Sequence, residues 1–153
     1  WLAGVSRKYG DITYRRSRYD GIEVTDVTKT YKSGLLFDRL QDRTLVVPES
    51  VTYGTRDYAV TSIAVSAFFN RTDLTEISLP DSLLRIREQA FSGCNGITKI
   101  TLGKGLEKIG DYAFRGCTGI KTVNYGGSEA DFAKVKIGSG NGYITSATIT
   151  YGE

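Results

Sequence analysis

The sequence of this 153-residue chain repeats with a period of 23 residues through its second half. The clearest sign is an Ala-Phe pair that recurs at Ala67-Phe68, Ala90-Phe91 and Ala113-Phe114. Four more apolar columns keep this spacing, and their members are Ile63, Ile86 and Ile109; Leu74, Ile97 and Ile120; Ile77, Ile100 and Val123; and Leu79, Leu102 and Tyr125. Such a repeat constrains the fold more strongly than any single motif, because its copies have to stack on one another.

Each repeat unit predicts one short strand and one tight turn. Ile77 and Leu79 lie two residues apart, as do Ile100 and Leu102, which is the period of a strand with one face inward. The Ala-Phe pair comes shortly before a Gly-containing turn and predicts a single helical or 3₁₀ turn. Because so small a unit cannot bury its apolar side alone, we predict a mainly β solenoid whose strands stack about 4.8 Å apart in a parallel ladder.

Two segments carry a resemblance to a known family. Residues 86–102 (IREQAFSGCNGITKITL) and their copy at 109–123 (IGDYAFRGCTGIKTV) closely resemble the BspA-like class of bacterial leucine-rich repeats. Residues 44–63 resemble that family's usual first unit, and residues 125–151 resemble its closing segment. The chain departs from the pattern at Arg71, where the other units have a cysteine, and at Gly103, which takes the position of Pro80.

The resemblance implies a right-handed leucine-rich-repeat solenoid and an exported protein. Members of the family are often found outside the cell, and some are described as adhesins towards host matrix or other bacteria. On this basis we expect a secreted or cell-surface bacterial protein.

The N-terminal part of the chain is predicted to form a separate element. Asp11–Tyr19 and Ile22–Thr28 flank Asp20-Gly21, which is a strong signal for a β-hairpin. We therefore assign residues 1–43 to an N-terminal β-hairpin cap or joining segment. Residues 44–125 hold the repeats, as an atypical first unit and three units that begin at Ile63, Ile86 and Ile109.

Residues 126–153 are predicted to form a C-terminal cap, because a solenoid has to cover its last apolar rung. Ser128 and Asp131 resemble a capping box and predict a helix-plus-strand cap that begins with a helix over residues 129–134. Phe132 and Val135 would close the core, and residues 149–151 alternate as a final strand.

The absence of histidine excludes much of hydrolytic enzymology. Without it the chain has no Ser-His-Asp triad, no Cys-His pair and no imidazole ligand for zinc. The net charge of +3 is spread evenly along the sequence, which argues against a dedicated polyanion binder. No apolar run is long enough to span a membrane. Since the chain starts at Trp1 rather than Met, we expect a processed form or a fragment.

Several motifs have a functional and a structural interpretation, and the structural one is favoured for each. Tyr14–Tyr19 interleaves aromatic and basic residues as nucleic-acid grooves do, but it equally fits a hydrated hairpin edge. Gly-rich stretches at 103–105 and 138–142 lack the spacing of a phosphate loop and suit turns. Carboxylates that could pair in a glycosidase fall at outward or turn positions, namely Glu76, Asp81, Glu88, Glu107 and Asp111. We predict no enzyme activity, no metal site, no cofactor and no nucleic-acid partner.

The two cysteines share one repeat column. Cys94 and Cys117 are expected on adjacent rungs with their Cα atoms about 4.8 Å apart, which a disulfide tolerates. Parallel side chains on a ladder do not automatically reach the dihedral angle of a disulfide, so buried thiols are favoured. The full set of predicted core positions is Ile63, Phe68, Ile77, Ile86, Phe91, Cys94, Ile100, Ile109, Phe114, Cys117 and Val123.

The outward face of the predicted strands is the candidate binding surface. Its residues vary between units while the inward columns do not, which is how repeat scaffolds build recognition surfaces. Its members are Glu76, Ser78, Lys99, Thr101, Thr122 and Asn124. A plain hydrated face is the alternative. Exposed tyrosines are alternative anchors, namely Tyr53, Tyr58 and Tyr112.

Taken as a sequence, the chain predicts a non-catalytic module that binds a protein or a glycan at the cell surface. The alternative is a structural subunit or spacer of an extracellular fibre, sheath or array, built by head-to-tail self-association of incompletely capped ends. An enzyme is the third and least supported class.

Overall fold

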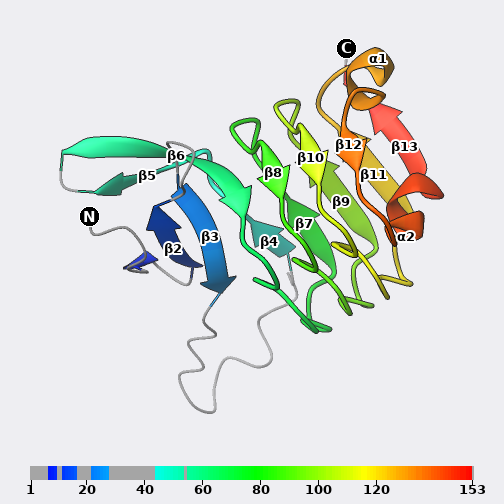
Figure 1. The fold of residues 1–153 in the computed structure, drawn as a ribbon, viewed down its shortest axis with the longest axis horizontal. Helices are drawn as coiled ribbons and strands as arrows, with labels where there is room; N and C mark the ends of the chain where they lie inside the picture. Colours follow the sequence, from blue (N-terminus) through cyan, green and yellow to red (C-terminus); the bar gives the residue numbers. More distant parts are fainter. Residues whose placement is uncertain (1–6, 10–11, 17–21, 28–43, 54, 153) are drawn as a thin grey trace.

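The computed structural model describes residues 7–9, 12–16, 22–27, 44–53 and 55–152. Within them two sheets run along the repeats (Figure 1). The first sheet has the spatial order β1 (Arg7–Tyr9), β2 (Ile12–Arg16), β3 (Ile22–Val27), β6 (Arg56–Ile63), β8 (Arg85–Ile86), β10 (Lys108–Ile109) and β12 (Lys136–Ile137), with β5 (Ser50–Tyr53) paired to β6. The second has the order β13 (Thr148–Tyr151), β11 (Thr122–Tyr125), β9 (Lys99–Leu102), β7 (Glu76–Ser78) and β4 (Thr44–Val46).

Each repeat contributes a rung to two parallel ladders. We call β6, β8, β10 and β12 the β10 ladder, and β4, β7, β9, β11 and β13 the β9 ladder; neighbouring strands in both are parallel. The mainly β solenoid is therefore confirmed, but the prediction of one strand per unit is wrong. The Ile63, Ile86 and Ile109 column lies on the β10 ladder, where neighbouring strands pair over only two residues at β8 and β10. A two-residue strand is too short to show alternation in the sequence.

The chain turns between the ladders at two left-handed positions per repeat. One column holds Ser66, Gln89 and Tyr112 at φ of 55° to 57°, and the other holds Asn70, Gly93 and Gly116 at φ of 56° to 80°. Between them the Ala-Phe segments form the expected short turns, such as the turn closed by the bond from Phe69 N to Ser66 O at 3.2 Å. The left-handed residues interrupt these turns before they can join into a helix.

Backbone groups of the turns also bond along the stack, from one unit to the next. Phe68 N donates to Ala90 O at 2.7 Å, and Phe91 N donates to Ala113 O at 2.8 Å. Each rung thus provides carbonyl acceptors for the N–H groups of the rung before it. The last rung has no following rung, so its N–H groups need another acceptor.

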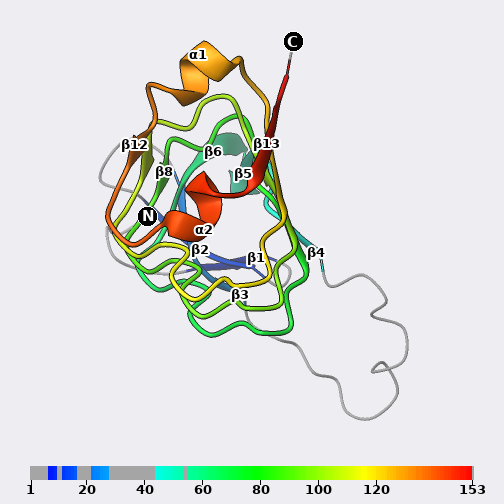
Figure 2. The same cartoon turned by 90° about the vertical axis from the view of Figure 1, so that its right-hand side faces the viewer.

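The C-terminal cap supplies that acceptor with a side chain. Asn141 is 3% exposed, and its Oδ1 accepts from Phe114 N at 3.0 Å while its Nδ2 donates to Gly110 O at 2.9 Å. The side-chain amide stands where the next rung would place a peptide group. Figure 2 shows α2 (Gly142–Thr145), which follows Asn141, lying across the open end of the coil. Ile144 of α2 is fully buried there.

The helix-plus-strand cap is confirmed in its main features. Ser128 is the N-cap of α1 (Glu129–Phe132), and its side chain accepts from Asp131 N, although the helix ends earlier than predicted. Val135 is buried, and Phe132 packs with its ring centroid 5.1 Å from that of Tyr125. α2 was not expected.

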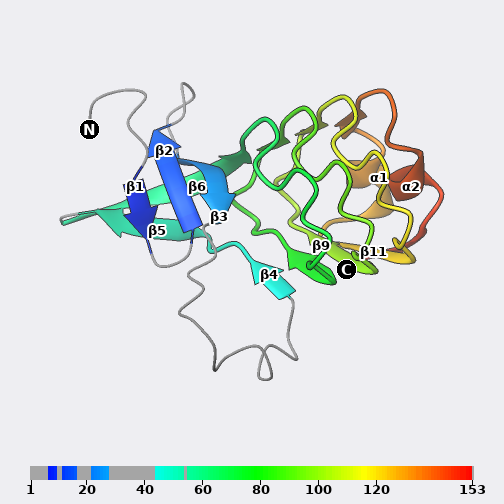
Figure 3. The ribbon, with the colours of Figure 1, turned by 90° about the horizontal axis from the view of Figure 1, so that it is seen from below.

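The N-terminal strands extend the first sheet. β2 pairs with β3 in the predicted antiparallel hairpin, β1 adds to β2, and β3 lies parallel to β6 (Figure 3). β5 and β6 form a second hairpin. The predicted Asp20-Gly21 turn lies outside the described residues, as do the last three residues of the Tyr14–Tyr19 motif. The boundaries proposed at 43, 125 and 153 stay predictions.

The core consists of buried repeat columns, and the phenylalanine column stacks ring on ring. All of the predicted core positions are at most 2% exposed. The rings of Phe68 and Phe91 lie 4.8 Å apart at an interplanar angle of 2°, and those of Phe91 and Phe114 lie 5.3 Å apart at 9°. Stacking therefore repeats at the spacing of the strands.

The cysteine column holds two free, buried thiols. Cys94 Sγ donates to Phe68 O at 3.0 Å, and Cys117 Sγ donates to Phe91 O at 3.1 Å. Burial raises the pKa of Cys94 to about 11 and that of Cys117 to about 12. The protonated thiols thus act as hydrogen-bond donors to the neighbouring rung.

Neither cysteine of the folded protein is expected to react with iodoacetamide at pH 8. At that pH a thiol with a pKa of about 11 is ionised in roughly one molecule in a thousand, and only the thiolate reacts. Mass spectrometry should show two labels after unfolding in guanidinium and none before it. Rapid native labelling would contradict the burial of this column.

The raised pKa values of the two thiols also predict how the free energy of unfolding depends on pH. Because the pKa of each thiol is higher in the folded state than in the unfolded state, the free energy of unfolding should fall as the pH rises from 9.0 towards 11 and 12.

Candidate binding face

The β9 ladder brings the six predicted face residues together in two rows. One row runs through Glu76, Lys99 and Thr122, which are register partners on adjacent strands. The second row follows the same register two residues later, through Ser78, Thr101 and Asn124. Partners on neighbouring strands stand about 4.8 Å apart, so the rows form a continuous polar patch. The inward residues between them, such as Ile100, are fully buried and hold the strands in register.

Two edge strands widen this face beyond the sequence prediction. β4 aligns Thr44 with Glu76 and Val46 with Ser78, and β13 aligns Thr150 with Asn124. The repeat period did not reveal these residues, because β4 and β13 lie in atypical end units where the spacing differs from 23. Val46 is 62% exposed and gives one end of the polar row an apolar side chain. We use the name β9 face for the two rows together with these edge residues.

The charges on the β9 face are matched with each other. Lys99 Nζ lies 3.8 Å from a carboxylate oxygen of Glu76, and both side chains are nearly half exposed. Thr150 Oγ1 donates to Asn124 Oδ1 at 2.7 Å. An exposed ion pair of this kind contributes little to stability, so its side chains can exchange partners when a ligand approaches.

The three tyrosines considered as alternative anchors do not join this face. Tyr58 packs against the core rather than standing exposed. Tyr112 is 42% exposed in the turn after β10, with the Arg115 guanidinium 5.6 Å from its ring centroid. Tyr53 belongs to β5, and its side chain lies outside the described part of the chain.

The carboxylates considered for catalysis have structural contacts instead. Asp81 accepts from Lys104 N at 2.9 Å, and Asp111 accepts from Ser139 N at 2.8 Å, so both hold a turn of the following rung. Glu88 lies 3.9 Å from the guanidinium of its neighbour Arg87.

The described residues offer neither a metal centre nor a membrane-spanning helix. Within that part of the chain, no group of three or more His, Cys, Asp and Glu side chains could hold a metal ion. No helix found there has the length and apolar character needed to cross a bilayer.

Solved structures of bacterial repeat proteins share this architecture. A leucine-rich repeat protein from Bacteroides capillosus ATCC 29799 superposes with a TM-score of 0.65 at 25% identity, over 78% of this chain and 80% of that one. One from Bacteroides ovatus ATCC 8483 gives 0.64 at 26% identity, over 79% of this chain and 31% of the other. A leucine rich cell surface protein from Faecalibacterium prausnitzii A2-165 gives 0.63 at 23% identity, over 84% and 34%. This chain thus spans about a third of the last two proteins.

The comparison with family models agrees with these folds. No curated protein matches the sequence. The family model described as the BspA type leucine rich repeat region (6 copies) matches residues 47–139, which hold most of both ladders and the start of the C-terminal cap. The chain belongs to the BspA-type leucine-rich repeat family.

Proposed function

We propose that the chain is a non-catalytic module, secreted or held at the bacterial cell surface, that binds a protein or a glycan through the β9 face. The observation that carries this proposal is the alternation of buried and outward residues along each strand of the β9 ladder. Inward residues are fully buried and nearly identical between rungs, whereas outward residues differ from rung to rung. A rigid scaffold that presents a variable, flat polar face is suited to recognition.

Two further observations support a location outside the cell and a role in binding. The similar protein from Faecalibacterium prausnitzii is described as a cell surface protein, which favours an extracellular location for this one. The carboxylates considered for general acid-base work are engaged in turns and ion pairs, which favours binding over catalysis.

Replacing three residues of the β9 face is expected to weaken ligand capture. The variant Lys99→Glu/Thr101→Ala/Asn124→Ala reverses one charge and removes two polar groups from adjacent rungs, while the buried columns stay intact. We expect affinity to fall by about tenfold or more, which corresponds to about 1.4 kcal/mol. Binding would be measured on arrays of purified glycans and purified extracellular matrix proteins, followed by titration of each ligand found.

The matched control is Arg115→Glu, an equal charge reversal at an exposed turn residue. It should bind as the unaltered chain does. The triple variant should melt slightly lower, because Lys99→Glu faces Glu76 across the ladder, and it should remain folded at the temperature of the binding assay. Equal affinity of the triple variant and the unaltered chain would show that the β9 face is the wrong surface.

A specific observation also favours the structural alternative. In the described part of the chain β4 and β13 are the ends of the β9 ladder, each paired on one side only. A second copy could add its β4 to β13 and continue the parallel ladder. Light scattering and electron microscopy separate the two functions. Long polymers that grow with concentration would replace the binding proposal, and a stable monomer would exclude the fibre.

A further inference from the structure

A groove of about 470 Å³ lies where the β10 ladder meets the C-terminal cap. It is bounded by the turn before β10, by the outward residues of the β10 ladder and by the segment from α1 to β12. Five of its lining side chains are basic, namely Arg85, Lys104, Lys108, Lys134 and Lys136. Two are acidic, namely Glu107 and Asp131. The groove therefore carries the same net charge, +3, as the whole chain.

Three of these cations form a row along one ladder. Arg85, Lys108 and Lys136 are register partners on β8, β10 and β12. Like charges that face each other across neighbouring strands repel and lower stability. The even distribution of charge along the sequence concealed this row, because its members come from two repeats and the C-terminal cap and the sequence did not reveal the β10 ladder.

The acidic residues of the groove neutralise only part of it. Arg85 lies 3.5 Å from a carboxylate oxygen of Glu107, and Lys134 donates to Asp131 at 2.9 Å. Hydrogen bonds from Ser128 and Lys134 lower the pKa of Asp131, so it stays ionised. For Lys108 and Lys136, no carboxylate among the described residues lies within ion-pair distance, and both side chains are exposed.

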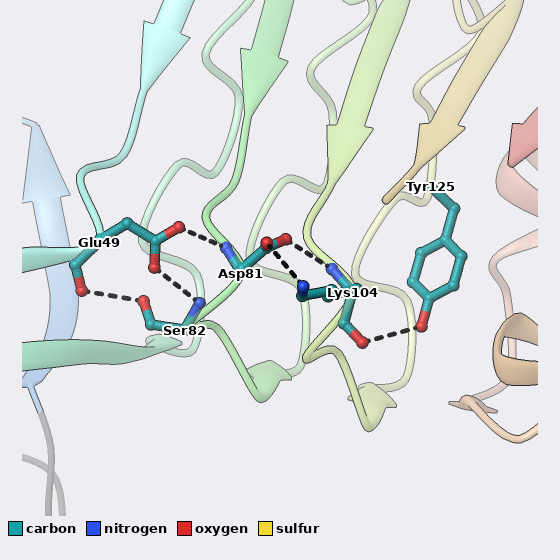
Figure 4. A network of polar contacts seen from close by, with 5 residues as sticks. All are labelled: Glu49, Asp81, Ser82, Lys104 and Tyr125. Atoms are coloured by element: carbon teal, nitrogen blue, oxygen red, sulfur yellow. Dashed lines mark hydrogen bonds and ion pairs between the residues drawn. The ribbon is translucent and has the colours of Figure 1, made fainter. Parts of the chain in front are cut away.

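A polar network fixes the wall of the groove (Figure 4). Glu49, Asp81 and Lys104 occupy corresponding positions in the turns that follow β4, β7 and β9. Glu49 accepts from Asp81 N and Ser82 N at 2.8 and 2.9 Å, and Asp81 accepts from Lys104 N at 2.9 Å. In the third of these turns the carbonyl oxygen of Lys104 accepts from Tyr125 Oη at 3.0 Å. This position is therefore acidic in the first two turns and basic in the third, which lines the groove.

We propose that this groove binds a linear acidic polysaccharide that carries carboxylate or sulfate groups on nearby sugars. The anionic groups lie against Lys108 and Lys136, for which the described part of the chain offers no carboxylate within ion-pair distance. Sugar hydroxyl groups donate to Glu107 and Asp131, which face the same groove. A DNA strand and a polyglutamate chain fit less well, because they bring anionic groups to these carboxylates without hydroxyl donors beside them. The site shares no residue with the β9 face and stands or falls independently of it.

The test uses the full chain and two acidic probes, a heparin oligosaccharide that carries sulfate and a galacturonate oligosaccharide that carries only carboxylate. Titration at low salt should show binding of at least one probe. The double variant Lys108→Gln/Lys136→Gln should weaken it by about tenfold or more, because each exposed charge contact is worth about a factor of three to five. Binding of heparin alone assigns sulfate recognition, and binding of galacturonate assigns carboxylate recognition.

The matched control is Arg115→Gln/Lys121→Gln, which removes the same charge from exposed positions outside the groove. It should keep most of the affinity. The melting temperature of Lys108→Gln/Lys136→Gln should not fall, because the variant removes a repulsion. The proposal is overturned if neither probe binds, if both double variants lose affinity equally, or if polyglutamate or single-stranded DNA of similar length binds as tightly as the better probe.

Discussion

Replacing Phe91 by alanine is expected to lower the free energy of unfolding by about 3–5 kcal/mol. Its ring is fully buried and stacks on the rings of both neighbouring rungs, at 4.8 and 5.3 Å. The cavity cannot close easily, because the backbone of Phe91 is held by the following rung and by its own turn. Phe91 N donates to Ala113 O, and Phe91 O accepts from Cys94 N and from Cys117 Sγ. Urea unfolding followed by circular dichroism would measure the loss.

Phe69→Ala provides the control for this change. Phe69 follows the stacked Phe68 in sequence, but its side chain is 49% exposed. We expect this variant to lose less than about 1 kcal/mol, since surface substitutions away from special contacts have small effects. Similar losses for the two variants would show that the phenylalanine column does not hold the rungs together.

Replacing Asn141 by alanine is expected to lower the free energy of unfolding by about 2–4 kcal/mol, because each buried polar group left without a partner costs about 1–3 kcal/mol. The variant removes the acceptor of Phe114 N and the donor to Gly110 O, in the interior of the last rung. It also removes a donor to Gly138 O at 2.8 Å, which holds the cap's own loop. Hydrogen exchange should show that the Phe114 amide is protected in the unaltered chain and exchanges rapidly in the variant.

Two further variants separate the capping role of Asn141 from its bulk. Asn141→Asp keeps an acceptor for Phe114 N but turns an oxygen towards Gly110 O, so it should also be strongly destabilised. Asn95→Ala makes the same deletion at an exposed turn residue and should have little effect. If Asn141→Ala unfolds at the same urea concentration as Asn95→Ala, the side-chain amide does not act as the end of the stack.

The sequence predicted those parts of the fold that repeat over enough residues to show a pattern. Ile100 and Leu102 alternate with outward residues, so the β9 ladder, its register and its buried side could be derived. The β10 ladder could not, because Ile86 and Ile109 each stand alone in two-residue strands. The structure shows this pairing, in which Arg85 and Lys108 are register partners.

The caps show the same limit for a different reason. Ser128 and Asp131 form a local signal within one helical turn, and that signal predicted α1 correctly. Asn141 acts on Gly110 and Phe114, which are far from it in sequence, and its Gly-rich neighbours indicate only a turn. The face residues were placed correctly on one surface, but their role in binding stays a prediction.

The amide of Asn141 also bears on how proteins of this kind can change in length. Among the described residues it bonds to the final repeat and to its own loop, so these contacts do not depend on how many units precede that repeat. Duplication or loss of a 23-residue unit in the interior of the array would leave the cap's docking site unchanged, provided the last unit kept its sequence. The cap thus depends on the last repeat and not on the number of repeats before it.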